Sequence, residues 1–158
     1  MKNKIVKFIN EIGTIMYVGG ILSHIVIGAV LGHENALTAY NVGTYKELSA
    51  YILILPGLGL KLLADLYMYK QYQTTPNWFK IKLLMLAFLS VNAFVFLVPM
   101  MPELVTLAKE SIPHGSVSDA YLDKAKVEAL VGMSNAIPLL IELIMGSFKP
   151  KLFGERNR

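Results

Sequence analysis

The sequence predicts an all-α, polytopic membrane protein: a bundle of four transmembrane helices with both termini in the cytoplasm. Hydrophobic residues make up 54% of the chain and charged residues only 16%, against roughly 25% charged residues in soluble domains. The apolar residues gather in four stretches, each close to the roughly 20 residues that cross a bilayer as a helix. Only short connections remain, so we expect a single domain over residues 1–158.

The first predicted span covers residues 12–31, after a basic start of sequence Met-Lys-Asn-Lys-Ile-Val-Lys. This start is similar to that of a signal peptide, but the apolar run is too long and has no Ala-x-Ala cleavage site. We therefore expect a helix that is retained in the membrane. A polar loop from His33 to Glu47 is expected to follow it.

The second predicted span covers residues 48–67 and contains Pro56-Gly57. Proline removes a helix hydrogen bond, so this pair should kink or loosen the helix near its outer third. The third span covers residues 82–101, and Trp78 precedes it at the position of an interfacial anchor. A loop over residues 102–126, with a short amphipathic helix near residues 120–129, should lead to the fourth span, residues 127–148.

Lysine and arginine near the ends of the spans predict the orientation, because cytoplasmic segments carry an excess of these residues. One side would hold the larger set, Lys2, Lys4, Lys7, Lys70, Lys80, Lys82, Lys149, Lys151, Arg156 and Arg158. The other side would hold Lys46, Lys109, Lys124 and Lys126. Both termini are therefore predicted to be cytoplasmic.

A few polar side chains interrupt the apolar spans, and charge within hydrocarbon usually marks function. At about 1.5 Å per residue, Lys61 and Glu142 lie roughly 8 to 9 Å from the cytoplasmic edge, with Asp65 one turn nearer to it. These three residues are expected to form a buried charge cluster. His24, Asn92 and Asn135 lie roughly 15 to 19 Å deep and are expected to form a second cluster.

Seven-residue spacing places these groups on single helix faces. Asn10, Tyr17 and His24 share one face of the first helix, as Glu128, Asn135 and Glu142 do on the fourth.

Structural interpretations compete with functional ones. Lys61 and Asp65 are four residues apart and can form a helix-surface pair, with Lys61 extending to the interface. Asn92 and Asn135 can act as interhelical hydrogen-bond partners. His24 is open to three interpretations: a packing residue, a haem or metal ligand, or a member of a proton relay.

Other features favour packing or exclude common enzyme classes. Gly28 with Gly32, and Gly132 with Ala136, have the spacing of closely packed helices. The chain has no cysteine, which excludes disulfides, thiolate metal sites and cysteine nucleophiles. A phosphate loop, a His-Glu-x-x-His motif and a Gly-x-Ser-x-Gly motif are absent from the sequence.

Several motifs along the chain resemble those of a family of bacterial membrane proteins. Trp78 to Leu83 matches Trp-x-x-x-Lys-Leu, and Gly13, Tyr17 and Gly20 match a Gly, aromatic, Gly pattern in the first span. The resemblance extends to the other spans, where the family's places for a Pro-Gly pair, an Asn-x-x-Pro motif and a closing Lys-Pro pair hold Pro56-Gly57, Asn135 to Pro138, and Lys149-Pro150. The chain is similar to four-helix predicted integral membrane proteins of unknown function and, more distantly, to membrane-type protoporphyrinogen oxidases and the copper-resistance D group.

The oxidase branch of this resemblance implies a haem b or porphyrin site. Lys82 would face a propionate or substrate carboxylate, and Trp78 and Asn135 would be further cofactor-binding candidates. His24 has no counterpart in the oxidase pattern, and it is the candidate ligand of haem iron because it is a histidine at mid-membrane depth. However, the histidine that the oxidases carry three residues before the first glycine is Asn10 here, and asparagine supplies no imidazole. The resemblance therefore implies the fold more than the oxidase activity.

Two hypotheses on function follow. The first is a non-catalytic helical bundle of the bacterial inner membrane, a small permease or a subunit of a membrane complex, whose partners are the lipid bilayer and either further copies or other membrane subunits. Its basic residues flank spans, so no nucleic acid is expected as a partner. The second is a haem- or porphyrin-associated redox membrane protein that uses His24 and Lys82.

Overall fold

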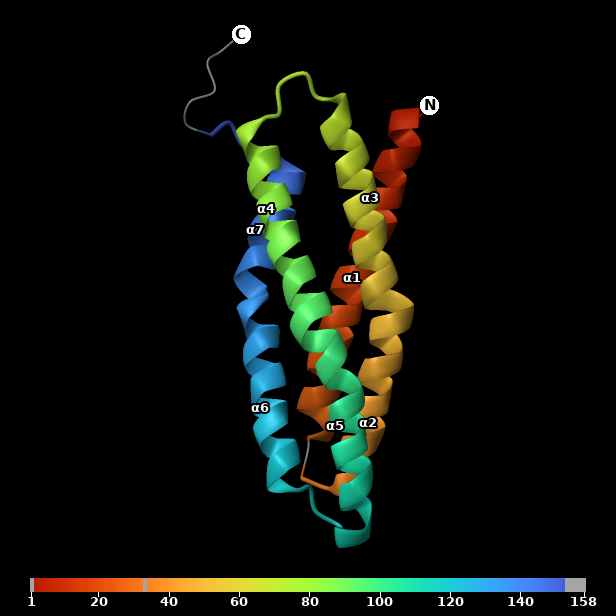
Figure 1. Ribbon diagram of the computed structural model, residues 1–158. Helices are drawn as coiled ribbons and strands as arrows, with labels where there is room; N and C mark the ends of the chain where they lie inside the picture. Colours follow the sequence, from red (N-terminus) through yellow and green to blue (C-terminus); the bar gives the residue numbers. More distant parts are fainter. Residues whose placement is uncertain (1, 33, 153–158) are drawn as a thin grey trace.

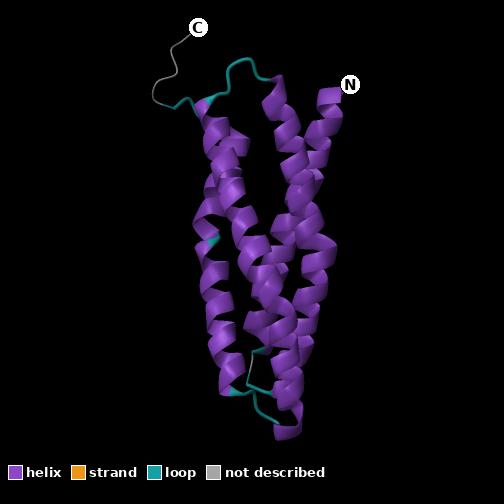
Figure 2. Cartoon of the chain, in the orientation of Figure 1, coloured by secondary structure: helices purple, strands orange, loops and turns teal. Residues whose placement is uncertain are grey.

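A computed structural model describes residues 2–32 and 34–152. These residues form four long helical rods, which run antiparallel to one another (Figure 1). The described residues are helical apart from short connections, and no strand is assigned among them (Figure 2). All four rods are long and apolar enough to cross a membrane. The prediction of an all-helical chain with four candidate membrane spans is therefore confirmed.

Three of the four rods are built from more than one helical segment. The first is α1 (Lys2–Leu31). The second joins α2 (Ala36–Ser49), the π-helical η1 (Ala50–Ile54) and α3 (Leu55–Gln71). The third joins α4 (Asn77–Val91), the π-helical η2 (Asn92–Leu97), α5 (Val98–Ser111) and the 3₁₀ turn η3 (Ile112–His114). The fourth joins α6 (Asp119–Ser134) and α7 (Ala136–Phe148).

Two predicted loops are largely helical in the structure. Most of the predicted loop from His33 to Glu47 is α2, because the Asn35 side chain accepts hydrogen bonds from the backbone of Leu37 and Thr38 and starts the helix. His33 itself lies outside the described residues. In the second loop, residues 102–126, α5 continues to Ser111, and Ser118 caps α6, which runs on into the predicted fourth span.

Prolines account for the irregular turns in the middle of three rods. Proline has no N–H and crowds the carbonyl four residues earlier, so the regular helix breaks one turn before it. Pro56 and Pro99 each follow a π-helical segment, η1 and η2 respectively. Pro138 follows Asn135, which separates α6 from α7. The predicted loosening at Pro56-Gly57 is thus present as η1.

The rods associate as two close pairs, α1 with α3 and α4 with α7. Away from the termini the two pairs are joined by extensive packing of α2 against α5, whereas α3 and α4 make few contacts. The ribbons of the two pairs separate toward the end where α1 begins, α3 connects to α4, and α7 ends (Figure 1). We call this the basic end, because the described Lys4, Lys7, Lys70, Lys80, Lys149 and Lys151 lie near it.

Glycines permit the close approach of α1 and α3. A Cβ atom on Gly57 would lie 2.7 Å from the backbone nitrogen of Tyr17, and one on Gly13 would lie 2.7 Å from the carbonyl oxygen of Gly57. The glycines predicted to serve this purpose are elsewhere. A Cβ atom on Gly32 or Gly132 would meet nothing within 4 Å, so the prediction of close packing at these two positions is wrong.

Candidate functional site: a buried ionic layer

Four charged side chains lie together in the basic half of the bundle, and we call them the ionic layer: Lys61, Asp65, Lys82 and Glu142. Lys61 and Asp65 come from α3, Lys82 from α4 and Glu142 from α7. Each is at most 4% exposed. Charged side chains this deeply buried must be paired with opposite charges, because removing each ion from water costs on the order of several kcal/mol.

The ion pairs of the layer cross from one helix pair to the other. Lys61 Nζ lies 3.0 Å from Glu142 Oε1, and Lys82 Nζ lies 2.6 Å from Asp65 Oδ1. Lys82 Nζ is also 3.7 Å from Glu142 Oε1, so the two pairs form one network. Two positive and two negative groups face one another. The layer connects α3 with α4 and α7, and α3 makes few direct contacts with either of these helices.

Helix α1 completes the layer with neutral polar groups. Asn10 Nδ2 donates to Asp65 Oδ1 at 2.8 Å, and Lys61 Nζ donates to Thr14 Oγ1 at 2.8 Å. Asp65 Oδ1 therefore accepts from both Asn10 and Lys82. All four rods contribute to the network, which makes it a connection across the entire basic half of the bundle.

Each carboxylate of the layer keeps one unsatisfied oxygen. Asp65 Oδ2 and Glu142 Oε2 are buried and have no hydrogen-bond partner among the described residues. Buried polar atoms in proteins are normally hydrogen-bonded, so unpaired acceptors on charged groups are unusual. These two oxygens leave the layer able to accept further donors.

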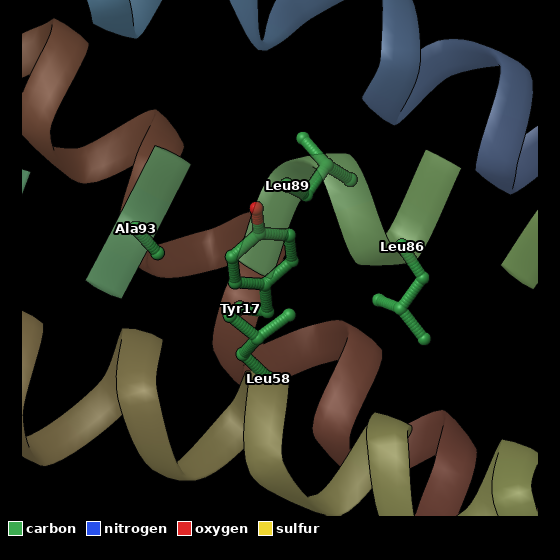
Figure 3. Packing of buried hydrophobic residues seen from close by; sticks show 5 residues of the cluster. All are labelled: Tyr17, Leu58, Leu86, Leu89 and Ala93. Carbon is green, nitrogen blue, oxygen red and sulfur yellow. The ribbon is translucent and has the colours of Figure 1, made fainter. Parts of the chain in front are cut away.

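An apolar layer closes the site on the side away from the basic end. Tyr17, Leu58, Leu86, Leu89 and Ala93 are buried and pack together (Figure 3). Tyr17 follows Thr14 by three residues, Leu58 precedes Lys61 by three, and Leu86 follows Lys82 by four. These offsets all lie in the same direction along the bundle, which places the apolar layer about 5 Å beyond the ionic layer.

Aromatic residues lie on the other side of the layer, toward the basic end. Phe79 is fully buried, with its ring 5.8 Å from Lys82 Nζ and 5.2 Å from the ring of Tyr72. Partial burial and the Asp65 carboxylate raise the pKa of the Tyr72 hydroxyl above its ordinary value of 10.0, so this phenol stays neutral at physiological pH. Trp78 packs against Phe79 and lies under Lys149 Nζ at 5.6 Å.

The structure brings Lys61, Asp65 and Glu142 together, as their common depth indicated. The alternative interpretation of Lys61 and Asp65 as a helix-surface pair is wrong, because Lys61 pairs with Glu142 and is buried instead of reaching the interface. Lys82 also belongs to the layer, although the sequence placed it at the membrane edge. Asn10 and Thr14, which are neutral, were not predicted to belong to the layer. The one indication in the sequence was that Asn10 shares a helix face with Tyr17 and His24.

The three residues expected at mid-depth separate into two places. Asn92 Nδ2 donates to Asn135 Oδ1 at 2.7 Å and to Ser134 Oγ at 3.1 Å, which ties η2 to the break between α6 and α7. His24 is not part of this cluster. Its Nε2 lies 2.5 Å from Ser49 Oγ, and its ring packs edge-on against Tyr45. His24 thus contacts α2, because this part of α1 packs mainly on the second rod.

The candidate haem residues do not fit a single haem. His24 follows Thr14, the α1 residue at the level of the ionic layer, by ten residues, which is about 15 Å along the axis. Lys82 is already engaged by Asp65, and Asn135 pairs with Asn92. Trp78 lies nearer the basic end, against Lys149. The geometry therefore gives no support to a haem held by His24 and Lys82.

The face of the fourth rod that carries Glu128, Asn135 and Glu142 also extends to the opposite half of the bundle. Glu128 pairs with Lys46 at 3.2 Å, and their side chains are 16% and 13% exposed. Together with Asn135 and Glu142, it joins α6 and α7 to other rods at three levels.

A scan against protein-family models and searches of the curated proteins and of the solved structures found no match to this chain.

Proposed function

We propose that this chain is a non-catalytic integral membrane protein of the bacterial inner membrane, and that it acts as a helical-bundle subunit of a larger membrane assembly. In this role both termini lie in the cytoplasm, and the ionic layer fixes the arrangement of the four rods. One observation carries the proposal: a balanced set of two lysines and two carboxylates spans the interface between the helix pairs.

The contacts of the layer favour a structural role over a catalytic one. Lys61 and Lys82 each have a carboxylate partner within the layer, so neither ammonium group is presented to a substrate. Buried polar and ionic groups can specify one arrangement of helices among several apolar alternatives. Here they select the partners and the register of α3, α4 and α7.

The perimeter of the bundle supports a membrane location and leaves room for neighbours. Large apolar side chains are exposed along the outer faces of the rods, among them Ile15, Leu63, Leu84, Leu130 and Ile137. Such faces suit lipid chains, and they also suit apolar helices of further subunits. The excess of lysine at the basic end favours placing that end in the cytoplasm.

The experiment that tests this proposal is the joint neutralisation of the charge cluster. Lys61→Met, Asp65→Asn and Glu142→Gln are combined in one chain, which is expressed in bacterial membranes and purified in a native-like lipid particle. Because the cross-pair contacts are lost, we expect the assembly formed by the wild-type chain, with itself or with co-purifying membrane subunits, to dissociate or lose yield. Light scattering and mass spectrometry of the intact particle measure the size and the composition of the assembly.

The matched control neutralises an exposed pair at the same end. Lys7 and Glu11 lie 3.8 Å apart with side chains 75% and 59% exposed, so Lys7→Gln with Glu11→Gln should leave the assembly intact. Unchanged assembly and stability in the triple variant would contradict the proposal.

A further inference from the structure

Two carboxylate oxygens of the ionic layer have no hydrogen-bond donor within reach among the described residues. These oxygens are Asp65 Oδ2 and Glu142 Oε2, which the described part of the chain leaves without a donor although both residues are at most 1% exposed. Lys61 already serves Thr14 and Glu142, and Lys82 serves Asp65. An unpaired carboxylate oxygen in a water-free interior is strongly disfavoured. The layer therefore calls for a small donor that fits between the rods.

We propose that the ionic layer is a water-binding site, reached by water from the basic end, and that bound water donates to Asp65 Oδ2 and Glu142 Oε2. A buried water molecule in a protein typically makes about three hydrogen bonds to polar groups that would otherwise be unsatisfied. The ionic layer offers two unpaired carboxylate acceptors, with the ammonium groups of Lys61 and Lys82 beside them. No apolar small molecule or additional cation meets the same requirements beside two lysines.

The packing around the layer sets the direction from which water arrives. Tyr17, Leu58, Leu86 and Leu89 close the path toward the opposite half of the bundle (Figure 3). Toward the basic end the helix pairs make few contacts, and Phe79 is the large side chain that packs beside Lys82. We therefore place the route of water on this side of the ionic layer, past the ring of Phe79. This inference concerns solvent access and is independent of whether the chain is a subunit of a larger assembly.

The absence of cysteine from the chain allows a direct test. Single cysteines are introduced by Thr14→Cys and Gly146→Cys in the lipid-embedded protein and treated with a small, charged, membrane-impermeant methanethiosulfonate reagent. Thr14 accepts from Lys61, and a Cβ on Gly146 would lie 3.4 Å from Lys82 Cε, so both positions border the layer. Leu63→Cys is the control, because Leu63 lies on α3 between Lys61 and Asp65 but is 67% exposed on the outer face.

The cysteine thiolate attacks the sulfur of the reagent and displaces methanesulfinate, and the thiolate forms readily in water and poorly in an apolar environment. We expect both layer cysteines to react about tenfold or more faster than Leu63→Cys, and only when the reagent is added at the basic end. Phe79→Ala should raise the rate for Thr14→Cys further. The Gly146→Cys variant removes no polar contact, so it provides the answer if Thr14→Cys fails to fold.

Layer cysteines that react no faster than Leu63→Cys, or that react only from the opposite end, would overturn the inference.

Discussion

The two halves of the bundle are held together by different interactions. In the basic half, α1 with α3 and α4 with α7 form two separate pairs, and buried charges connect them. In the opposite half, α2 packs directly on α5, and small or apolar residues fill the contact, including Ala39, Leu104 and Ala108. The comparison shows that one short helical bundle can use close apolar packing at one end and an ionic network at the other.

This difference has an energetic consequence. Apolar contacts between membrane helices gain little over contacts with lipid, so close packing of small residues must supply their stability. Buried ion pairs, in contrast, tolerate wider helix separation, but they are sensitive to the loss of either partner. We therefore expect substitutions in the two halves to differ in magnitude more than in direction.

The largest effect should come from removing one charge of the ionic layer. Glu142→Gln deprives Lys61 of its carboxylate at 3.0 Å while keeping the shape of the side chain. An uncompensated buried charge costs about 3–5 kcal/mol, so the free energy of unfolding should fall by that order. Reversible unfolding in mixed detergent and lipid, followed by circular dichroism, measures the change.

The control for Glu142→Gln is a substitution on the same face of the fourth rod, in the opposite half of the bundle. Glu128→Gln removes the partner of Lys46, but this pair is partly solvated, so we expect a loss of about 1 kcal/mol or less. Equal losses for Glu142→Gln and Glu128→Gln would remove the distinction between the halves.

The next largest effect should come from the glycine contact of α1 with α3. In Gly57→Ala the new Cβ would lie 2.7 Å from the backbone nitrogen of Tyr17, so the helices must move apart at a cost of about 1–3 kcal/mol. Gly59→Ala is the control, because its Cβ would meet nothing within 4 Å. There the better helix propensity of alanine should leave stability unchanged or slightly raised. Similar losses in both variants would argue against close packing at Gly57.

A smaller effect is expected at mid-bundle, where an amide pair connects the third and fourth rods. Asn92→Ala removes the hydrogen bonds to Ser134 and Asn135. Interhelical hydrogen bonds in membranes contribute about 0.6 to 2 kcal/mol, so the loss should lie between those for Glu128→Gln and Glu142→Gln. The same unfolding assay ranks the three variants, and a loss for Asn92→Ala larger than that for Glu142→Gln would contradict the ranking.

The smallest effect should follow substitution of His24. His24→Ala removes the contact with Ser49 Oγ and leaves every group of the ionic layer in place. We expect little change in stability and no change in the visible absorption of the purified protein. A Soret band that disappears in His24→Ala would instead establish His24 as a haem ligand and favour the redox hypothesis.

The sequence alone predicted the helical class, four helices long and apolar enough to span a membrane, and the common level of Lys61 and Glu142, because hydropathy and helical rise determine these features. It did not predict that α2 and much of α5 are helical. Their polar composition resembles that of loops, and the side-chain cap of Asn35 became evident only in three dimensions.

The choice of partners was also beyond the sequence. Lys61 lies four residues from Asp65 and could pair with it locally, but the rotation of α3 turns both toward α4 and α7, where Glu142 and Lys82 are available. Likewise, the shared depth of His24 and Asn92 did not bring them into contact, because depth specifies the level of a residue and not which rods are neighbours.

The central claim is that Lys61 and Glu142 stabilise the bundle through each other. A double-mutant cycle with Lys61→Met and Glu142→Leu measures their coupling free energy directly, and a parallel cycle on the exposed pair of Lys7 and Glu11 provides the control. We expect coupling of about 0.5–3 kcal/mol for the buried pair and close to zero for the exposed pair. Additive losses at Lys61 and Glu142, with no coupling between them, would contradict the claim.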